Sequence, residues 1–418
     1  MRTVFHGGRV FDATGVNVAS GDVVVEDGAI VEVGQGLDGD DGVDCSGGVV
    51  VPGFIDCHVH FMASGDLDPI SGARTPFSLK FFHAARNMRA TLAAGITSVR
   101  DAGGTDLGTK TARDRGLIAG PRTTISITAL SQTGGHGDSW QVCGADMPRF
   151  IVPHPGAPSN IVDGPEEMRR KVRELVRAGA EVIKVCTSGG VLSPRDDPRH
   201  GHFRDAELSV LVEEATAAGI FVMAHAQATD GIKAAVRNGI RSIEHGIYLD
   251  DEAIAMMLDR GTYLVPTLMA PRGVLEAADA GMNVPPEAVA KTKMVMEAHS
   301  SSISAAIAAG VRVAMGTDSG VMPHGRNLEE LALMVECGMA PADALIATTR
   351  TAAELIGCAD RVGTIEPGKR ADLLVVDGDP LDVTTLPRRI RSVYLDGEPV
   401  AVDTDSPPTV TRFPDAQQ

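Results

Sequence analysis

Short β-branched runs alternate with amphipathic helical stretches through the middle of the chain, and this alternation limits the fold more than any other feature. In residues 165–180, Pro165 stands at an early position and apolar residues recur at steps of three and four, as in a helix with one buried face. Strands that alternate with helices in this way form parallel α/β sheets. The strand-like runs match the strand count of a closed (β/α)8 TIM barrel: residues 54–59, 96–99, 122–128, 182–186, 220–225, 241–244, 263–266 and 311–317.

The two ends of the chain have a different sequence pattern from the middle. The stretch GDVVVEDGAIVEVG near the start and GTIEPGKRADLLVVDGDP near the end are short apolar runs broken by Gly and Asp turns, which predict strands and hairpins. We expect both ends to meet in one small β-sandwich domain, residues 1–52 plus 364–418, with the barrel formed by residues 53–363. The Gly-, Pro- and His-rich segment 131–164 is expected to be a loop over the barrel mouth.

Charge and hydropathy exclude some classes of partner. The 418-residue chain has 55 acidic and 38 basic residues and a net charge of −17, so its field repels phosphate backbones and we expect no nucleic-acid partner. No stretch approaches the ~18 uncharged apolar residues that span a bilayer, and no apolar signal region follows the N-terminus. We therefore expect no membrane association and a cytoplasmic location. The cysteines have no CxxC spacing, which indicates neither a zinc ribbon nor a disulfide framework.

Polar residues close, or interrupt, five of the apolar strands. In a (β/α)8 barrel the carboxyl ends of all strands meet at one mouth, so such residues are candidates for function. His58 and His60 are two positions apart, which places both imidazoles on the same face of the first strand. A lysine inside an apolar strand is costly, because its ammonium must be paired, neutralised or modified when it is buried. The remaining strands contribute Lys184, His225, His245 and Asp318.

Taken singly, each of these residues could have an ordinary structural role, such as that of a hydrogen-bonded histidine or a turn aspartate. Their shared position at predicted strand ends is what indicates a metal site. Imidazole and carboxylate ligands suit Zn²⁺, and also Mn²⁺, Fe²⁺, Co²⁺ or Ni²⁺, because affinity alone does not choose among these ions. We expect zinc.

The segments GFIDCHVH, IKV, MAHA, IEHG and GTD resemble the metal motifs of the amidohydrolase superfamily, and PGKRADLLVVD is similar to its closing segment. The resemblance covers nearly the whole chain and implies two divalent metal ions. His58 and His60 would bind the more buried ion together with Asp318. The more exposed ion would be bound by His225 and His245.

The resemblance also implies a role for Lys184 and a mechanism. Carbon dioxide would N-carboxylate Lys184, and the resulting carbamate anion would bridge two ions that otherwise repel each other. A bridging water, present as hydroxide near neutral pH, would attack the substrate carbonyl. Asp318 would act as the proton carrier and hand the proton to the leaving nitrogen.

Three further segments, TGGHGD, KVCTSGGVLSPRDDP and GTDSGVMPHGRNLEEL, are similar to the prolidase-like branch of metal-dependent dipeptidases and carboxypeptidases. Small-molecule substrates in that branch, dipeptides or N-acyl amino acids, commonly keep a free carboxylate beside the scissile amide. His136 is the candidate to hold this carboxylate, and His324 and Arg326 on the loop after the last strand are further candidates. Gln227 stands where relatives often have a tyrosine, so its amide would meet the substrate with a different reach and shape.

Several alternatives stay open. The same ligand set would serve hydrolysis of an imidazolone ring, carbamate, urea or lactone. A deaminase of the superfamily would use one metal and a glutamate at the position of Ala228, and a non-enzymatic scaffold would have lost ligands, whereas all six positions are present. The ring of helices around such a barrel often pairs with another copy, so we expect an even-numbered homo-oligomer.

Overall fold

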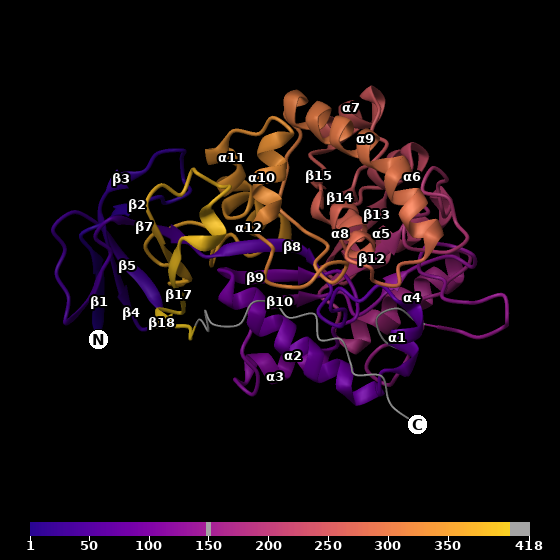
Figure 1. The fold of residues 1–418 in the computed structure, drawn as a ribbon, viewed down its shortest axis with the longest axis horizontal. Helices are drawn as coiled ribbons and strands as arrows, with labels where there is room; N and C mark the ends of the chain where they lie inside the picture. Colours follow the sequence, from indigo (N-terminus) through magenta and orange to yellow (C-terminus); the bar gives the residue numbers. More distant parts are fainter. Residues whose placement is uncertain (148–151, 402–418) are drawn as a thin grey trace.

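The computed structural model describes residues 1–147 and 152–401, and both ends of this range lie in a strand-rich part beside a larger part wrapped in helices (Figure 1). The larger part begins with β8 (Phe54–Val59) and holds the parallel strands. These parallel strands, their covering helices and the strand-rich part agree with the predicted α/β fold class, a (β/α)8 TIM barrel with a small β-sandwich domain.

The barrel strands form two runs in which every neighbouring pair is parallel. The first run has the order β10-β9-β8 and the second β11-β12-β13-β14-β15. Most of these strands are buried along their whole length, as expected where helices cover the outside and side chains fill the inside. After β8 they are β9 (Ile96–Asp101), β10 (Arg122–Ile125), β11 (Ala129–Leu130), β12 (Val182–Cys186), β13 (Phe221–Ala226), β14 (Ser242–His245) and β15 (Tyr263–Val265).

Backbone hydrogen bonds join the two runs at both seams and close the barrel. At one seam the amide of Glu181 donates to the carbonyl of Ile125 over 2.9 Å. At the other, residues 311–319 lie between β15 and β8, where Ala314 N donates to Leu264 O over 2.9 Å and Cys57 N donates to Met315 O over 2.9 Å.

Two predicted strands differ from the observed ones. The prediction of a regular strand at 311–317 is wrong, because this segment forms only isolated bridges on either side. A Cβ on Gly316 would lie 2.4 Å from Val265 Cγ1, and Asp318 turns to φ 60°, so the chain bends away from the ladder here. The predicted strand 122–128 is cut short in the same way, since Ile127 adopts φ 68°.

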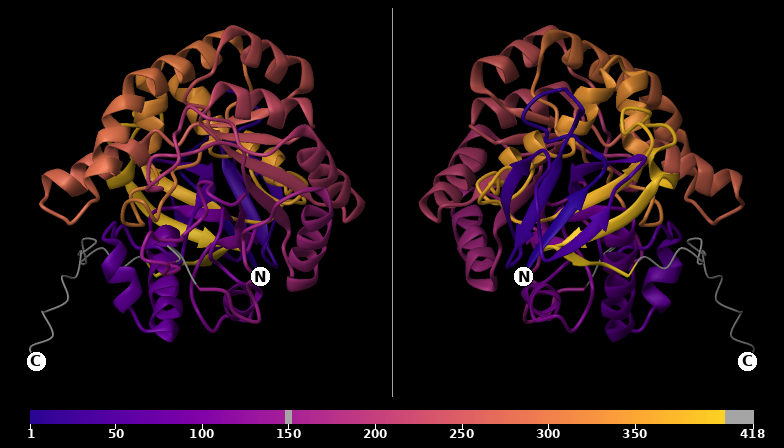
Figure 2. Two further views of the ribbon diagram at one scale, coloured as in Figure 1. Left: turned by 90° about the vertical axis from the view of Figure 1, so that its right-hand side faces the viewer. Right: turned by 90° about the vertical axis from the view of Figure 1, so that its left-hand side faces the viewer.

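Helices cover the outside of the barrel strands, as both views in Figure 2 show. The predicted helix 165–180 is confirmed as α4 (Pro165–Ala178), which starts on Pro165 and ends where Gly179 takes the left-handed φ of 98°. The others are α1 (Pro69–Arg74), α2 (Phe77–Ala93), α3 (Leu107–Asp114), α5 (Asp205–Ala217), α6 (Thr229–Arg237), α7 (Asp251–Arg260), α8 (Met269–Asp279), α9 (Pro286–Ala309), α10 (Glu329–Glu336), α11 (Pro341–Ala347) and α12 (Arg350–Ile356).

The strand-rich part consists of two sheets packed face to face. Their order is β5-β4-β1-β6 in one and β18-β17-β16-β7-β2-β3 in the other. Antiparallel pairing of Leu374 with Val51 joins the C-terminal and N-terminal ends of the chain, and Phe5 meets Tyr394 edge-to-face at 4.8 Å in the core between the sheets. The strands are β1 (Arg2–His6), β2 (Arg9–Val10), β3 (Ala19–Ser20), β4 (Asp22–Glu26), β5 (Ala29–Gly34), β6 (Asp41–Asp44), β7 (Gly48–Pro52), β16 (Leu373–Asp377), β17 (Ile390–Leu395) and β18 (Glu398–Pro399).

The domain boundaries at residues 52 and 364 stay a prediction, and residues 402–418 of the predicted sandwich lie outside the described residues. The described parts of segment 131–164 contain isolated bridges, such as Ser131 with Ile161, and no helix. This segment lines the main cavity. Within residues 1–147 and 152–401, no helix is long and apolar enough to cross a membrane.

Candidate metal centre

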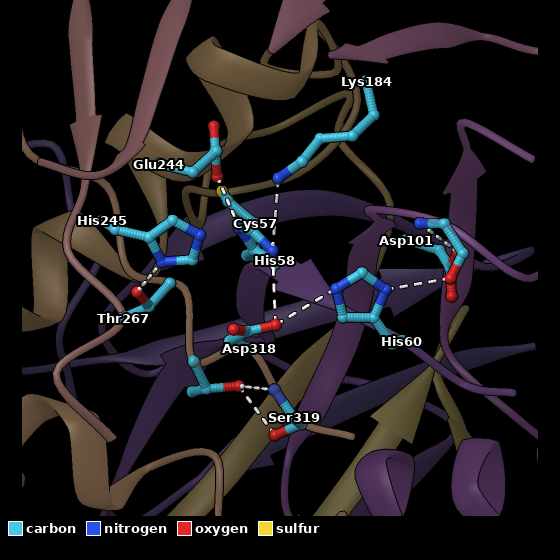
Figure 3. A network of polar contacts seen from close by, with 12 residues as sticks. Cys57, His58, His60, Asp101, Lys184, Glu244, His245, Thr267, Asp318 and Ser319 are labelled. Atoms are coloured by element: carbon cyan, nitrogen blue, oxygen red, sulfur yellow. Dashed lines mark hydrogen bonds and ion pairs between the residues drawn. The ribbon is translucent and has the colours of Figure 1, made fainter. Parts of the chain in front are cut away.

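The six predicted metal ligands line one cavity of about 1100 Å³ at the carboxyl ends of the barrel strands. His58 lies one residue before the end of β8, and His60 directly follows this strand. Lys184 lies within β12 and His225 within β13, and His245 is the last residue of β14. Asp318 follows the irregular segment that closes the barrel. Figure 3 shows the side chains of His58, His60, Lys184 and Asp318 pointing toward one another.

His58, His60 and Asp318 form the tightest group. One ligand atom from each lies within 4.8 Å of the others. Asp318 Oδ1 is 3.4 Å from His58 Nε2 and 3.1 Å from His60 Nε2, and Lys184 Nζ is 3.5 Å from His58 Nε2. These atoms therefore face a common point, as ligands of a metal ion would.

The other ring nitrogen of each of these two histidines is held by the protein. His58 Nδ1 lies 2.8 Å from Glu244 Oε2, and His60 Nδ1 donates to the carbonyl of Gly103 over 2.9 Å. A partner on Nδ1 fixes both the orientation of the ring and the tautomer, and it leaves the Nε2 lone pair for a metal ion.

One ring nitrogen of His225 and one of His245 are likewise held by hydrogen bonds to the protein. His225 Nε2 donates to Gly189 O over 3.0 Å, which leaves Nδ1 for an ion. The Thr267 hydroxyl donates to Pro266 O over 2.7 Å, so its oxygen accepts the Nδ1 proton of His245 over 2.6 Å. This leaves the Nε2 lone pair of His245 for an ion. The His225 and His245 ring centroids are 4.6 Å apart, and His245 lies 5.2 Å from His58.

Burial keeps these groups in the form that a metal requires. It lowers the pKa of His58, His225 and His245 well below the usual range, so that their imidazoles are neutral. Burial also lowers the pKa of the Lys184 ammonium, which favours the neutral amine, the form that can react with carbon dioxide. Four imidazoles, an amine and a carboxylate thus form a donor set that fits divalent metal ions.

The Asp318 carboxyl is subject to opposing influences. Burial raises its pKa, but the nearby His58 and His60 hold the pKa below its usual range, so the carboxylate is ionised. Asp318 adopts φ 60°, His245 φ 74° and Thr267 φ 52°. Left-handed backbone is uncommon for residues other than glycine and often accompanies functional sites, where the surrounding structure maintains it.

Sequence reasoning missed a buried network beneath the ligands. Glu244 Oε1 accepts hydrogen bonds from Arg100 Nη2 over 2.8 Å and Ser242 Oγ over 2.6 Å, while Oε2 faces His58. Arg100 is buried and also donates to Cys57 O over 2.8 Å. The signal was present, because Glu244 and Arg100 interrupt apolar strands just as Lys184 does.

His136, a predicted substrate-binding residue, lies beside the metal ligands. Its ring stacks on His225 with centroids 4.1 Å apart and planes at 12°, and it lines the cavity. The close approach requires Gly190, because a Cβ there would lie 2.3 Å from His136 Cε1. Nδ1 of His136 is 2.8 Å from Ser193 Oγ and 3.6 Å from Asp196 Oδ2.

A lysine that the sequence did not single out holds the loop beneath His136. Lys291 Nζ donates to the carbonyls of Gly190 over 3.1 Å and Ser193 over 2.8 Å, and it pairs with Asp196 Oδ1 at 3.2 Å. Lys291 lies on α9, far along the chain from this loop, and no local pattern links the two.

The other three predicted substrate-binding residues differ in their surroundings. Gln227 lines the cavity and is 5% exposed. His324 also borders the cavity, but Nδ1 contacts Thr91 Oγ1 at 3.2 Å and Nε2 donates to Ala63 O over 3.0 Å, so the protein occupies both nitrogens. Arg326 does not belong to the described lining, because its guanidinium pairs with Glu276 at 2.7 Å and Glu329 at 2.6 Å.

Comparison with known proteins identifies the family to which the chain belongs. The model of the amidohydrolase family matches residues 49–403. The chain belongs to the amidohydrolase family. An ochratoxinase of Aspergillus niger is 37% identical to this amidohydrolase over 366 residues, which cover 84% of this chain and 75% of the ochratoxinase.

Solved structures place the amidohydrolase in the prolidase-like branch. A Xaa-Pro dipeptidase with bound methionine in its active site has a TM-score of 0.87 and 31% identity, covering 96% of this chain and 100% of the dipeptidase. A prolidase complexed with N-methylphosphonate-L-proline has a TM-score of 0.87 and 36% identity, covering 96% and 99%. The predictions of superfamily, branch and enzyme class are confirmed: the chain is a metal-dependent hydrolase acting on C–N bonds.

Proposed function

We propose that this amidohydrolase cleaves an amide bond next to a free carboxylate, in a dipeptide or an N-acyl amino acid, at a centre of two divalent metal ions. The observation that carries the proposal is the anchoring of all four histidines, each by one ring nitrogen, around Asp318 and Lys184. The relatives support the substrate class, since methionine and a proline phosphonate, the ligands of two similar structures, both carry an amino-acid carboxylate.

The chain would hold the two ions in adjacent positions. His58, His60 and Asp318 would bind one ion, and His225 and His245 the other. Lys184, N-carboxylated by carbon dioxide, would contact both, and zinc is the ion we expect. When bound, such ions supply Lewis-acid polarisation of a carbonyl and lower the pKa of a water molecule.

Asp318 is the proton carrier in this proposal. Its carboxylate is ionised and has backbone support, because its own amide donates to His58 O over 2.8 Å. From this position it would accept the proton of the attacking water and deliver it to the nitrogen of the leaving amine. The reaction then releases a carboxylic acid and an amine.

His136 would bind the free carboxylate of the substrate. The Ser193 hydroxyl donates to Asp196 Oδ1, so its oxygen accepts from His136 Nδ1. The neighbouring Asp196 is ionised, since His136 and Ser193 overcome the effect of burial and hold the pKa of Asp196 below its usual range. A negative charge beside Nδ1 stabilises a positively charged imidazole, which is suited to a carboxylate. Gln227 lines the same cavity, whereas His324 and Arg326 are not part of the proposed subsite.

Paired substrates test the proposal. Metal-quantified enzyme is assayed on dipeptides, on N-acyl amino acids and on the C-terminal amides of the same compounds, with the released amine as readout. We expect cleavage of the free acids and little cleavage of the amides. Equal cleavage of both would contradict the carboxylate requirement. If fully loaded enzyme cuts nothing in the library, the proposed substrate class is wrong, and imidazolones, carbamates, ureas and lactones are tested next.

Two broader predictions accompany this proposal. An even-numbered homo-oligomer would appear in light scattering as an even multiple of 43.6 kDa, and an odd multiple or a monomer would contradict it. The cytoplasmic location and the absence of a nucleic-acid partner also stay predictions.

A further inference from the structure

Two buried side chains on one wall of the metal cavity each have an unsatisfied polar atom. They are His299 on α9, which is 1% exposed, and Gln227 after β13, which is 5% exposed. Several described residues have a buried polar atom without a partner, but only these two line the cavity. Buried polar groups are nearly always paired, so such atoms beside a catalytic centre are candidate acceptors for a hydrogen bond from a substrate.

The tautomer of His299 is set by its neighbours. Nε2 lies 3.0 Å from the carbonyl of His245 and 2.8 Å from the carbonyl of Pro266, and carbonyls only accept, so Nε2 carries the proton. Nδ1 of the neutral ring therefore presents a lone pair. No described residue donates to it. A substrate group that binds at this position would therefore have to be a hydrogen-bond donor.

Gln227 is fixed beside the strand-end histidines. Its backbone is held on both sides, because Gln227 N donates to Ser188 Oγ over 2.7 Å and Gln227 O accepts from Tyr248 N over 2.9 Å. Its Oε1 atom is the second acceptor without a partner in the described structure. Both acceptors thus lie on the His225 and His245 side of the site.

Apolar side chains complete this wall. Val191, Ile247 and Val295 form a buried cluster, and all three line the cavity. Val295 precedes His299 by one helical turn on α9, and Ile247 follows His245 by two residues. A ligand on this wall would therefore meet hydrogen-bond acceptors and an apolar surface together.

The chemistry of an aminoacyl substrate matches this combination. If the scissile carbonyl is polarised on the side of His225 and His245, the adjacent Cα carries both the α-ammonium and the side chain. We infer that His299 Nδ1 and Gln227 Oε1 accept hydrogen bonds from the α-ammonium of a dipeptide, whose apolar N-terminal side chain packs on Val191, Ile247 and Val295. This inference rests on the proposed function and selects dipeptides over N-acyl amino acids that lack the amine.

The test compares Leu-Met with its desamino analogue, 4-methylpentanoyl-Met, which differs only in the amine. The metal-loaded protein should prefer Leu-Met in kcat/KM by roughly 10- to 100-fold, the effect of hydrogen bonds to a charged group. His299→Phe keeps a ring but removes the Nδ1 acceptor together with the Nε2 donor to the carbonyls of His245 and Pro266. The readout is therefore the ratio of kcat/KM for the two compounds, and this variant should abolish most of the preference for Leu-Met. Gln227→Leu provides the same test if His299→Phe does not fold.

Each outcome is decisive. Equal cleavage of both compounds by the unaltered protein overturns the inference and leaves the proposed function standing. A loss of activity in His299→Phe and Gln227→Leu that is the same for both compounds shows that the two residues only support the fold, and it also overturns the inference. If neither compound is cleaved while other amides are, the inference fails together with the dipeptide substrate.

Discussion

Replacing Glu244 by glutamine should weaken metal binding without changing any metal ligand. Glu244 Oε2 faces His58 Nδ1 at 2.8 Å, while Oε1 accepts from Arg100 and Ser242 over 2.8 and 2.6 Å. A glutamine has one acceptor oxygen for these two groups of donors, so its amide NH₂ must face either His58 or Arg100. The side chain is 0% exposed, so no water can substitute.

The expected losses of metal affinity and of folding stability depend on whether His58 or Arg100 loses its carboxylate partner. Loss of the carboxylate that orients a metal-binding histidine lowers metal affinity by about 10- to 100-fold. Breaking a buried ion pair costs about 3–5 kcal/mol, and we expect the lower end, because Arg100 keeps its hydrogen bonds to Cys57 O and Ser242 Oγ, at 2.8 and 3.0 Å.

Competitive metal titration and urea unfolding of the metal-free protein measure the two effects separately. Glu32→Gln is the matched control, because Glu32 pairs with Arg2 at 3.0 Å on the surface, with side-chain exposures of 52% and 42%. Its effect on stability should stay within about 1 kcal/mol, with unchanged metal affinity. Native metal affinity in Glu244→Gln would refute the role assigned to this network.

Three further changes have defined outcomes. Lys184→Ala should bind fewer ions per chain than the native protein, with partial recovery by added short carboxylic acids, and unchanged stoichiometry would contradict a bridging carbamate. Asp318→Asn should keep most of its metal and lose nearly all turnover in the dipeptide assay, whereas full activity would exclude Asp318 as the proton carrier. Burial raises the pKa of Glu330 from 4.5 to about 8, so its protonated form stabilises the fold and this contribution is lost as pH rises between these values. Urea unfolding at pH 5 and pH 8 should therefore show a smaller pH dependence in Glu330→Gln than in the native protein, and an equal dependence would remove Glu330 as its source.

The barrel and the inward-facing strand ends could be predicted because they depend on periodicity and on the cost of burying charge. A period of two places His58 and His60 on one face, and the cost of burying an ammonium inside an apolar strand marks Lys184 as a functional residue. Glu244 and Arg100 carry the same signal, since each is a charged residue inside an apolar strand.

Contacts between distant loops could not be predicted in this way. Arg326 was a candidate because it follows the last strand, but its carboxylate partner Glu276 is 50 residues away in the chain. Lys291 and the loop that carries Asp196 are 95 residues apart. The irregular path at 311–319 depends on the fit of Gly316 against Val265, which is a property of the folded barrel and not of local sequence.

The number of metal ions in the active protein, measured by elemental analysis together with dipeptide turnover, tests the proposed centre most directly. We expect roughly two divalent ions per chain, loss of turnover when a chelator removes them, and recovery when they are added back. Full turnover with no bound ion, or with a single ion per chain, would contradict a two-metal centre held by His58, His60, Lys184, His225, His245 and Asp318.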